Sequence, residues 1–305
     1  MVGLSLCKTQ KAMLNLHQAL QNVQAYRKFR IQDLLCVEYT CPDQRDKFEF
    51  WMEVGCLVYC TAGKKLYRSS MQDLCVETGS IFFLKKGAYT GKNFVDETYC
   101  ALMFFLPDQY IREFLLRYDA LKSEPQQAGA EVQDGIISLQ RESVLETFFF
   151  SILQYFSSPI ELQKDILRIK LDELLFNLFT HPLHKPIANY LYSLLSDQQA
   201  QLHQIMEENY ASNMKLEEYA QLCHLSLSSF KRAFTKHYQQ SPAKWILNKK
   251  LQLATRLLQL TDKPINEISF QCGFESTSHF IRVFKKYTHL TPKQFRALKE
   301  PQLIN

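Results

Sequence analysis

Short hydrophobic runs separated by turn residues fill the chain from about residue 29 to residue 106. The runs are rich in β-branched and aromatic side chains, and they lie at 48–54, 56–60, 65–70, 80–84 and 100–106. Glycine-containing segments such as TAGKK, ETGS and KKGAY stand between them. Short strands at this spacing are typical of an antiparallel sandwich or small barrel, so we expect a β-rich N-terminal domain.

The hydrophobic period changes after Pro107. Apolar residues then recur three and four positions apart in the segments 107–118, 141–156 and 161–179, which predicts three helices. The third carries a wide apolar stripe, formed by Ile160, Leu167, Leu171, Leu174 and Leu178 with Leu162, Ile166 and Ile169 beside it. Such a stripe needs cover, which either the domain's own sheet or a second copy of the helix could provide.

Two prolines in HPLHKP (181–186) end this helix, and another helical stretch follows at 187–197. We therefore expect a first domain over 1–180, a linker over 181–200 and a second domain over 201–305. The fold class is α+β, with a β-sandwich and trailing helices followed by an all-α domain. His181 and His184 have a spacing that would also suit a metal, but the adjacent prolines and the lack of a third ligand favour a linker.

The second domain contains an internal repeat with a period of 50 residues. The equivalent pairs are Phe230 and Phe280, Arg232 and Arg282, Phe234 and Phe284, Lys236 and Lys286, Pro242 and Pro292, and Trp245 and Phe295. A fixed period identifies a duplicated structural element. Both copies end alike, with Ser241-Pro242 and Thr291-Pro292, a hydroxyl residue suited to capping followed by proline at the first helical position.

Each copy has the pattern of a helix, a tight turn and a second helix. Helices are predicted over 216–223 and 227–238 in the first copy, and over 265–272 and about 276–287 in the second. The turns are His224-Leu225 and Gly273-Phe274. This is the helix-turn-helix arrangement, at about 215–238 and 265–287, which presents its second helix to the DNA major groove.

A connecting helix over about 242–259 sets the distance between the two copies. Eighteen residues at 1.5 Å each span ~27 Å. With the flanking elements added, the two second helices can lie about one DNA turn, ~34 Å, apart. One chain could then bind two successive segments of the major groove.

The charge is divided unevenly between the domains. Residues 201–305 hold 15 Lys and Arg against 8 Asp and Glu, a net +7, whereas residues 1–200 hold 21 against 23, a net −2. A basic domain joined to a mildly acidic one is typical of a polyanion-binding domain attached to a sensing domain.

Several classes of protein are disfavoured. No apolar run reaches the ~18 residues of a membrane span, and the N-terminus lacks a secretory pattern, so we expect a cytosolic protein without a membrane partner. The nine cysteines form no CxxC pair and are expected to be reduced thiols, with a redox sensor as the alternative. Residues 1–180 hold one histidine, His17, and the chain has no phosphate-binding glycine motif. We therefore expect no catalysis, no cofactor and no metal.

The stretch 202–298 resembles the DNA-binding domain of the AraC/XylS family of bacterial transcription regulators. In the first copy the matching residues are Ala220, Leu222, Ser226, Phe230, Arg232 and Phe234. In the second they are Gly273-Phe274, Ser278, Phe280, Arg282, Phe284-Lys285-Lys286, Thr291-Pro292 and Phe295-Arg296. His224, Gln239 and His289 stand at turns where that family often has glycine. The first domain resembles the family's cupin-like sensing domain through 77–89 and 169–179. Together with the modest size, these segments look like the branch that includes activators of type III secretion genes.

The resemblance implies a homodimer whose first domain responds to a small-molecule or protein effector, and whose second domain binds double-stranded DNA and recruits RNA polymerase at the nucleoid. Carried over by position, the base-contacting candidates are Ser228, Lys231 and Arg232, and Thr277, Ser278, His279 and Arg282. The phosphate-contacting candidates are Ser226, Lys236, Ser276, Lys285 and Lys286. The alternative for each is a solvated helix face. The helical spacing of Phe230, Phe234, Phe280 and Phe284 indicates core residues rather than base-stacking ones.

These patterns predict a sequence-specific transcription regulator, and an activator rather than a repressor. A signal would change the contacts of the first domain, both helix-turn-helix copies would then occupy adjacent major grooves, and an exposed surface would contact polymerase. The alternatives are a repressor on the same scaffold, and a cupin-like enzyme or ligand-binding protein whose basic tail binds nucleic acid without specificity.

Overall fold

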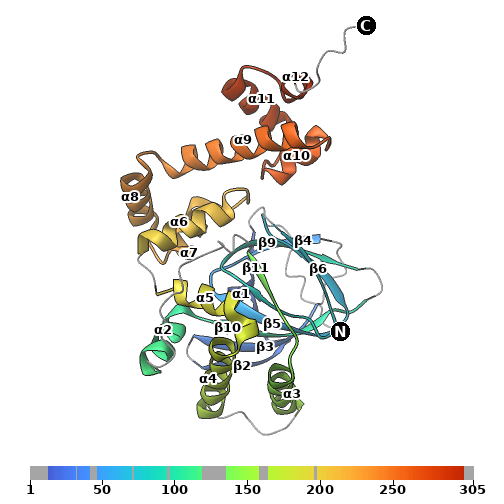
Figure 1. Ribbon diagram of the computed structural model, residues 1–305, viewed down its shortest axis with the longest axis vertical. Coiled ribbons are helices and arrows are strands. Elements are labelled where there is room, and N and C mark those ends of the chain that lie inside the picture. Colours follow the sequence, from blue (N-terminus) through green and yellow to red (C-terminus); the bar gives the residue numbers. More distant parts are fainter. Residues whose placement is uncertain are drawn as a thin grey trace. The chain divides into compact units, whose positions relative to one another are not determined.

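The computed structural model describes residues 13–31, 33–41, 47–70, 72–94, 97–118, 135–157, 164–195 and 198–298. The chain divides into an N-terminal unit, Met1–Gln201, and a C-terminal unit, Leu202–Asn305. The N-terminal unit combines two β-sheets with helices, and the C-terminal unit is helical where it is described (Figure 1). This arrangement is the predicted α+β class.

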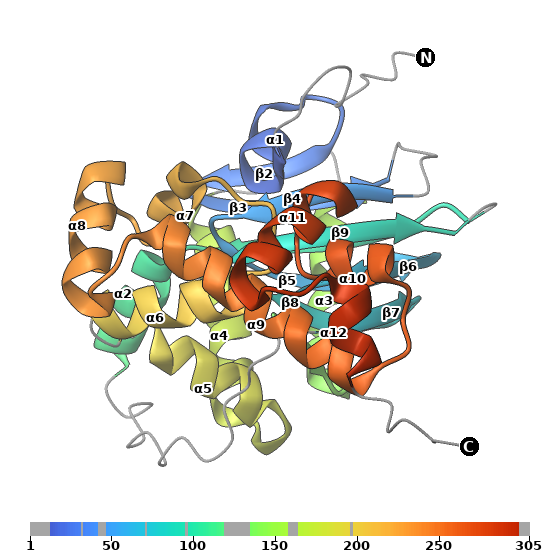
Figure 2. The same ribbon diagram turned by 90° about the horizontal axis from the view of Figure 1, so that it is seen from above.

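Two sheets form the centre of the N-terminal unit (Figure 2). The six-stranded sheet has the order β11 (Ile136–Leu139), β8 (Ile81–Leu84), β5 (Gly55–Ala62), β10 (Cys100–Leu106), β3 (Leu34–Thr40) and β2 (Arg27–Ile31). The five-stranded sheet has the order β1 (Leu14–Asn15), β4 (Lys47–Met52), β9 (Gly87–Asn93), β6 (Lys64–Arg68) and β7 (Asp73–Glu77). The described pairs are antiparallel except that of β1 with β4. In the six-stranded sheet, Phe104 of β10 lies opposite Cys36 on one side and Leu57 on the other.

The six-stranded sheet is buried on both faces. Along β10, Leu102, Phe104 and Leu106 enter a core shared with helices. The alternate residues Ala101, Met103 and Phe105 enter the core between the two sheets. A sheet covered on both faces needs an apolar side chain at every position, which explains why β10 is the continuous run CALMFFL rather than an alternating one.

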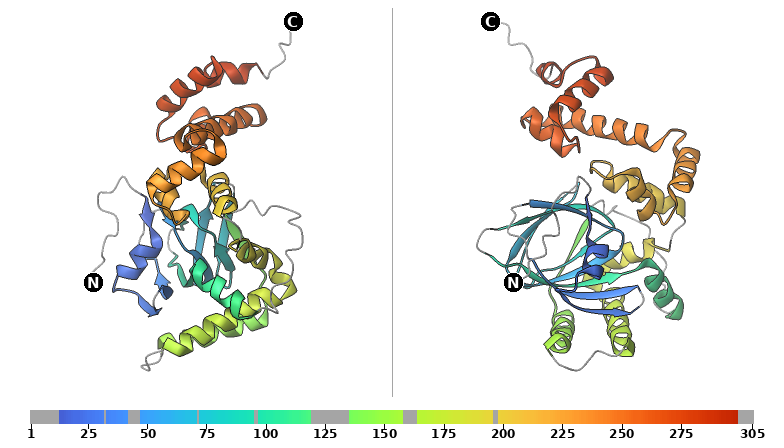
Figure 3. Two further views of the ribbon diagram at one scale, coloured as in Figure 1. Left: turned by 90° about the vertical axis from the view of Figure 1, so that its left-hand side faces the viewer. Right: turned by 180° about the vertical axis from the view of Figure 1, so that it is seen from behind.

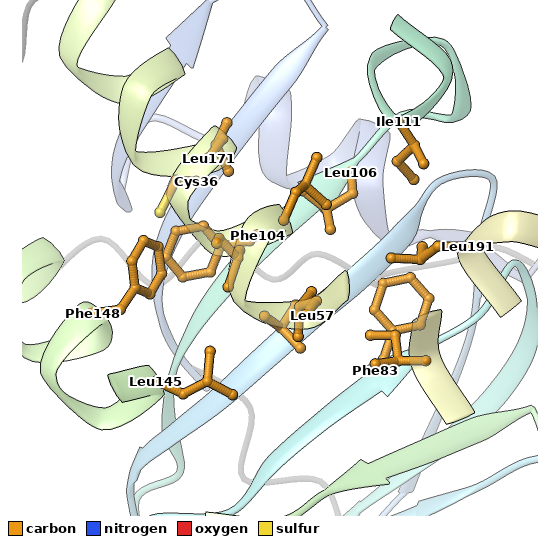
Figure 4. Packing of buried hydrophobic residues seen from close by; sticks show 14 of the residues in the cluster. Cys36, Leu57, Phe83, Phe104, Leu106, Ile111, Leu145, Phe148, Leu171 and Leu191 are labelled. Atoms are coloured by element: carbon orange, nitrogen blue, oxygen red, sulfur yellow. The ribbon is translucent and has the colours of Figure 1, made fainter. Parts of the chain in front are cut away.

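Helices cover the outer face of this sheet. They are α2 (Asp108–Arg117), α3 (Ser143–Ser157), α4 (Lys164–Thr180) and α5 (Lys185–Ser193). Figure 4 shows Leu145 and Phe148 of α3 and Leu171 of α4 lying toward the strand residue Phe104, with Leu191 of α5 beside Phe83. A short helix, α1 (Leu16–Asn22), contacts β4.

The apolar stripe predicted on the third helix is covered by its own unit. Leu167, Leu171, Leu174 and Leu178 are all buried in the core that α4 shares with the six-stranded sheet, whereas Ile169 is 65% exposed. Ile160 and Leu162 lie outside the described residues. The sheet therefore covers these apolar residues, and this face of α4 is not available to a second copy.

The segment predicted as a linker contains core structure. A short 3-10 helix, η2 (Pro182–His184), leads into α5, which buries Ile187, Tyr190 and Leu191 in the N-terminal core. Residues 181–195 are therefore part of the N-terminal unit rather than a linker, and residues 196–197 lie outside the description. The prolines end α4 as expected, but the apolar face of the next helix finds cover on the same sheet.

From residue 216 onward the C-terminal unit follows the predicted order of helices, and it also contains a helix before them that the sequence analysis did not predict. Its helices are α6 (Gln198–Asn209), α7 (Leu216–Leu222), α8 (Leu227–Tyr238), α9 (Pro242–Leu260), α10 (Ile265–Gln271), α11 (Thr277–Thr288) and α12 (Pro292–Ala297). The first turn of α6 precedes Leu202, where the C-terminal unit begins. The long helix α9 has α8 at one end and α10 to α12 at the other (Figure 3). We call α7–α8 the first motif and α10–α11 the second motif.

Candidate DNA-binding interface

Each motif has its own aromatic core. In the first motif the rings of Phe230 and Phe234 lie 5.8 Å apart between centroids, and Phe234 meets Trp245 of α9 at 5.8 Å. In the second motif Phe280 and Phe284 lie 5.4 Å apart. All four phenylalanines are fully buried. They are core residues, as their spacing predicted, and cannot stack on bases.

The second core completes the repeat. Phe284 contacts Phe295 of α12 at 5.5 Å, edge to face, as Phe234 contacts Trp245. The second residue of the turn, Phe274, also packs on Phe280 at 5.1 Å. Because equivalent aromatic residues pack each second helix against its neighbours, α8 and α11 are held in place by equivalent contacts.

Serine caps begin both second helices. The side chain of Ser226 accepts a hydrogen bond from Ser229 N at 3.2 Å, and that of Ser276 accepts one from His279 N at 3.3 Å. These bonds satisfy donors that a helix N-terminus leaves free. Thr291 caps α12 in the same way, but Ser241 at the start of α9 makes no side-chain capping bond, which corrects the expected equivalence of the two closing segments.

The turns use the left-handed backbone region. Gly273 has φ +73° and His224, at the equivalent place in the first motif, has φ 54°. The helix ends at Gln239 and His289 have φ 54° and 63°. Three of these four positions hold residues for which that region is costly, and they are the positions where the sequence departs from glycine.

The second helices of the two motifs expose the same face. The order of buried, half-buried and exposed positions is identical over 231–240 and 281–290. On α8 the side chains of Ser228, Lys231 and Arg232 are exposed. On α11 those of Ser278, His279 and Arg282 are exposed, while Thr277 is half-buried at the first helical position. The structure therefore brings the predicted base-contacting residues together as two surface stripes, one on each motif.

The candidate phosphate contacts lie at the ends of these stripes. Lys236 is in the last turn of α8, and Lys285 and Lys286 are in the last turn of α11, all exposed. Ser226 and Ser276 are at the opposite ends, and Ser226 Oγ also lies 3.1 Å from Ser228 Oγ. Each stripe thus has hydroxyl groups at its N-terminal end and cations at its C-terminal end.

Within the described residues, no ion pair joins the cations of the two stripes to a carboxylate. In the described part of the C-terminal unit, ion pairs join Lys249 to Glu207 and Lys263 to Glu267, on other elements. None involves the lysines and arginines of α8 or α11. An exposed guanidinium without a carboxylate partner keeps its donors for another anion or for base-edge acceptors.

Two residues of interest escaped the sequence analysis. Ile281 is 36% exposed and occupies, fifty residues later, the position of Lys231. The repeat alone could have identified it. Lys250, in α9, is half-buried, and its Nζ donates to backbone carbonyls at 3.0 and 2.7 Å. No local sequence signal distinguishes this lysine from the exposed ones around it.

Two observations concern chemistry other than DNA binding. All eight cysteines within the described ranges have free thiols, and Cys7 lies outside those ranges. None of the described helices combines the length and apolarity of a membrane span.

Comparison with protein families gives two matches. Residues 55–190 match the ExsA N-terminal regulatory domain, and residues 219–298 match a helix-turn-helix domain. The first match lies within the N-terminal unit and ends in α5. The second contains most of α7 together with α8 to α12.

Individual relatives match over most of the chain. The virulence regulon transcriptional activator VirF of Yersinia enterocolitica is 27% identical over 241 residues, which are 78% of this chain and 87% of VirF. The HTH-type transcriptional regulator ExsA of Pseudomonas aeruginosa is 25% identical over 229 residues, 74% of this chain and 80% of ExsA. Among solved structures, ToxT from Vibrio cholerae aligns with 88% of this chain and 99% of its own, with a TM-score of 0.42 and 13% identity.

Proposed function

Because this chain belongs to the AraC/XylS family of DNA-binding transcription regulators, we propose that its two motifs bind two successive major-groove segments of one duplex. The observation that carries this proposal is the equivalence of α8 and α11, whose exposed and buried positions follow one order fifty residues apart. The helix that joins the motifs, α9, has 19 residues. At 1.5 Å each it extends ~28 Å, close to the ~34 Å of one DNA turn.

The roles of the side chains follow from their chemistry. Arg232 and Arg282 have the planar, two-donor geometry that matches the guanine edge, and they are assigned base contacts. Lys231 is assigned a base contact beside Arg232. The smaller polar candidates, with hydroxyl or imidazole groups suited to base edges, are Ser228, Thr277, Ser278 and His279.

Phosphate contacts fix the register of the protein on the duplex without specifying sequence. They are assigned to the lysines in the last turns and to the capping serines, namely Ser226, Lys236, Ser276, Lys285 and Lys286. Ile281 lies three residues after Ser278 and one before Arg282, on the same face, where an exposed apolar group suits a thymine methyl.

The N-terminal unit is assigned the regulatory role. Most of it matches a regulatory domain, and relatives such as VirF bear the name of transcriptional activators. We infer an activator whose N-terminal unit binds a small molecule or protein effector and forms a homodimer, and whose DNA-bound form contacts RNA polymerase. Such an effector must bind the active conformation more tightly than the inactive one, since equal affinity would shift nothing.

Base-by-base binding measurements test the assignment of the two arginines. A bound site is first selected from random duplexes, and every single-base variant of it is then measured with the full-length protein and with Arg232→Ala and Arg282→Ala. Each variant should lose about 1–3 kcal/mol of discrimination at its own base position. Lys286→Ala, which removes a cation assigned to phosphate, is the matched control and should weaken all sites evenly.

The same site decides between the proposal and its alternatives. Losses spread evenly over all bases in both arginine variants would indicate a nonspecific nucleic-acid binder and contradict specific recognition. Footprinting should reveal two protected major-groove segments per monomer, about one turn apart; protection of a single segment with both motifs folded would contradict the two-segment arrangement. A reporter gene driven from the bound promoter separates an activator, which raises expression, from a repressor, which lowers it.

A further inference from the structure

Lys250 joins backbone from two distant parts of the C-terminal unit. Its ammonium donates to Ser212 O at 3.0 Å and to Gly273 O at 2.7 Å. Ser212 belongs to the loop between α6 and α7, 38 residues earlier, and Gly273 is in the turn of the second motif, 23 residues later. The side chain therefore connects the loop that precedes the first motif with the turn of the second.

The loop and the turn also touch each other directly. Gly273 has φ +73°, and a Cβ built on it would lie 2.0 Å from Ala211 O, far inside contact distance. Only a residue without a side chain allows the two backbones to come this close. We call the contact of Ala211, Ser212, Lys250 and Gly273 the clasp.

Each side of the clasp is fixed to a motif. On the first side, the buried Tyr219 of α7 donates its hydroxyl to Asn209 O at 2.6 Å, and Ser212 Oγ donates to the same carbonyl at 2.7 Å. On the second side, Gly273 N donates to Phe270 O at 2.9 Å, which closes the end of α10. A displacement at the clasp is therefore transmitted to both motifs.

The clasp is made by a charged group at neutral pH. Burial lowers the pKa of Lys250 to about 8, so the amine still holds its proton below that pH. Burial also raises the pKa of the neighbouring Cys272 to about 12, so that thiol is uncharged. An ammonium has three donors, and two of them are directed to the carbonyls of Ser212 and Gly273.

We propose that Lys250 is a positioning residue that fixes the orientation of the two motifs relative to each other, and thereby sets the spacing between the two DNA segments that one chain binds. This inference rests on the proposed two-segment binding. The core of the second motif packs against α9 through Leu251, Ala254 and Leu258, which holds that motif to the helix. Lys250 is the residue, within the described part of the unit, whose side chain donates to backbone associated with both motifs.

The test measures spacing preference, which loss of stability alone does not alter. The full-length protein and Lys250→Met are bound to the selected two-segment site, to versions with one to five base pairs inserted between the segments, and to versions with one segment randomised. Lys249→Met is the matched control, because it removes an adjacent lysine whose ion pair with Glu207 stays within the first half of the unit. Lys250→Arg retains the charge and several donors.

The wild-type protein and Lys249→Met should prefer one spacing by at least tenfold. In Lys250→Met this preference should fall about tenfold, with affinity lost at the preferred spacing and little changed on single-segment sites. Lys250→Arg should recover most of it. Denaturant midpoints followed by Trp245 fluorescence in a Trp51→Phe background verify folding. Lys250→Gln, too short to reach both carbonyls, replaces the methionine variant if that variant is unfolded.

Two negative results have different meanings. If the wild type protects two segments and prefers one spacing, and Lys250→Met keeps that preference while its affinity falls evenly, the positioning role is refuted and two-segment binding stands. If the wild type itself has no spacing preference, two-segment binding fails, and the role of Lys250 fails with it.

Discussion

The left-handed residues at the helix ends should limit the stability of the C-terminal unit. Gln239 ends α8 and His289 ends α11, with φ values of 54° and 63°. Each donates its backbone N–H to the carbonyl four residues earlier, at 2.9 Å to Thr235 and 2.8 Å to Lys285. Glycine is the usual residue at such an end because it has no Cβ to meet the neighbouring carbonyl.

The size of the effect can be worked out for His289→Gly. A left-handed conformation destabilises the folded state by about 1–2 kcal/mol when the residue has a Cβ. Glycine removes this strain, but its greater freedom in the unfolded chain offsets about 0.5–1 kcal/mol of the gain. The His289 side chain is exposed and makes no hydrogen bond within the described residues. The net gain should therefore be about 0.5–1 kcal/mol. Gln239→Gly should stabilise the unit less, because Gln239 Nε2 donates to Lys236 O at 2.8 Å and that hydrogen bond would be lost.

The assay uses the two tryptophans of the chain. Trp51 is buried in the N-terminal unit and Trp245 in the C-terminal unit, so a Trp51→Phe background leaves Trp245 as the reporter of the latter. In urea, with a slope of about 2 kcal/mol/M, His289→Gly should raise the midpoint by about 0.3–0.5 M. His289→Ala is the control, since it removes the imidazole but retains the Cβ. Equal stabilisation by alanine and glycine, or a lower midpoint for glycine, would refute the reasoning.

Two further predictions concern the N-terminal unit, observed through Trp51 in a Trp245→Phe background. Lys86, in the turn after β8, pairs with Asp108 at the start of α2, and both are buried. Lys86→Met should lower the free energy of unfolding by about 3–5 kcal/mol, because it removes the ammonium that pairs with the buried Asp108 carboxylate, and the double variant Lys86→Met/Asp108→Leu should lower it by less. Equal urea midpoints for the two variants would contradict this. His184 is buried, neither ring nitrogen has a hydrogen-bond partner within the described residues, and burial, followed by His181, lowers its pKa. The folded state therefore disfavours the protonated ring, and stability should fall as pH drops below the unfolded pKa of about 6.5, by at most about 1.4 kcal/mol per pH unit, until the folded pKa is reached. His184→Leu should flatten this part of the pH profile; an unchanged slope between pH 7 and 5 would count against it.

Local sequence patterns predicted most of the C-terminal unit. The 50-residue period, the phenylalanines four apart and the serine caps each involve residues within one or two helical turns, so they fix helices α7 to α11 to within two residues. The exposed stripes follow from the same periodicity, because the side opposite a buried face is exposed. Ile281 follows as well once the repeat is aligned, although it lacks the polar chemistry that drew attention to its neighbours.

The N-terminal unit was less predictable because cover from distant segments determines it. The helix over 185–193 looks like a short polar-flanked segment with a proline in its first turn, and only its packing on the six-stranded sheet makes it part of the core. The sequence left open whether a sheet or a second copy covers the stripe of α4, and in the structure the stripe packs on the six-stranded sheet. Hydrophobic periodicity states that a face must be covered, but it does not say by what.

The sequence by itself determined the duplicated helix-turn-helix architecture, the uneven charge and the residues displayed on α8 and α11, since each depends on spacing along the chain. Only the tertiary structure decided that Lys250 donates to the backbone of Ser212 and Gly273 while Lys249 pairs with Glu207, and that Gly273 meets Ala211. Those contacts join residues 38 and 23 positions apart from Lys250, so they exist only once α6, α9 and the second turn have packed together. A helix period assigns a face to each residue, but the partner of that face is set by the path of the whole chain.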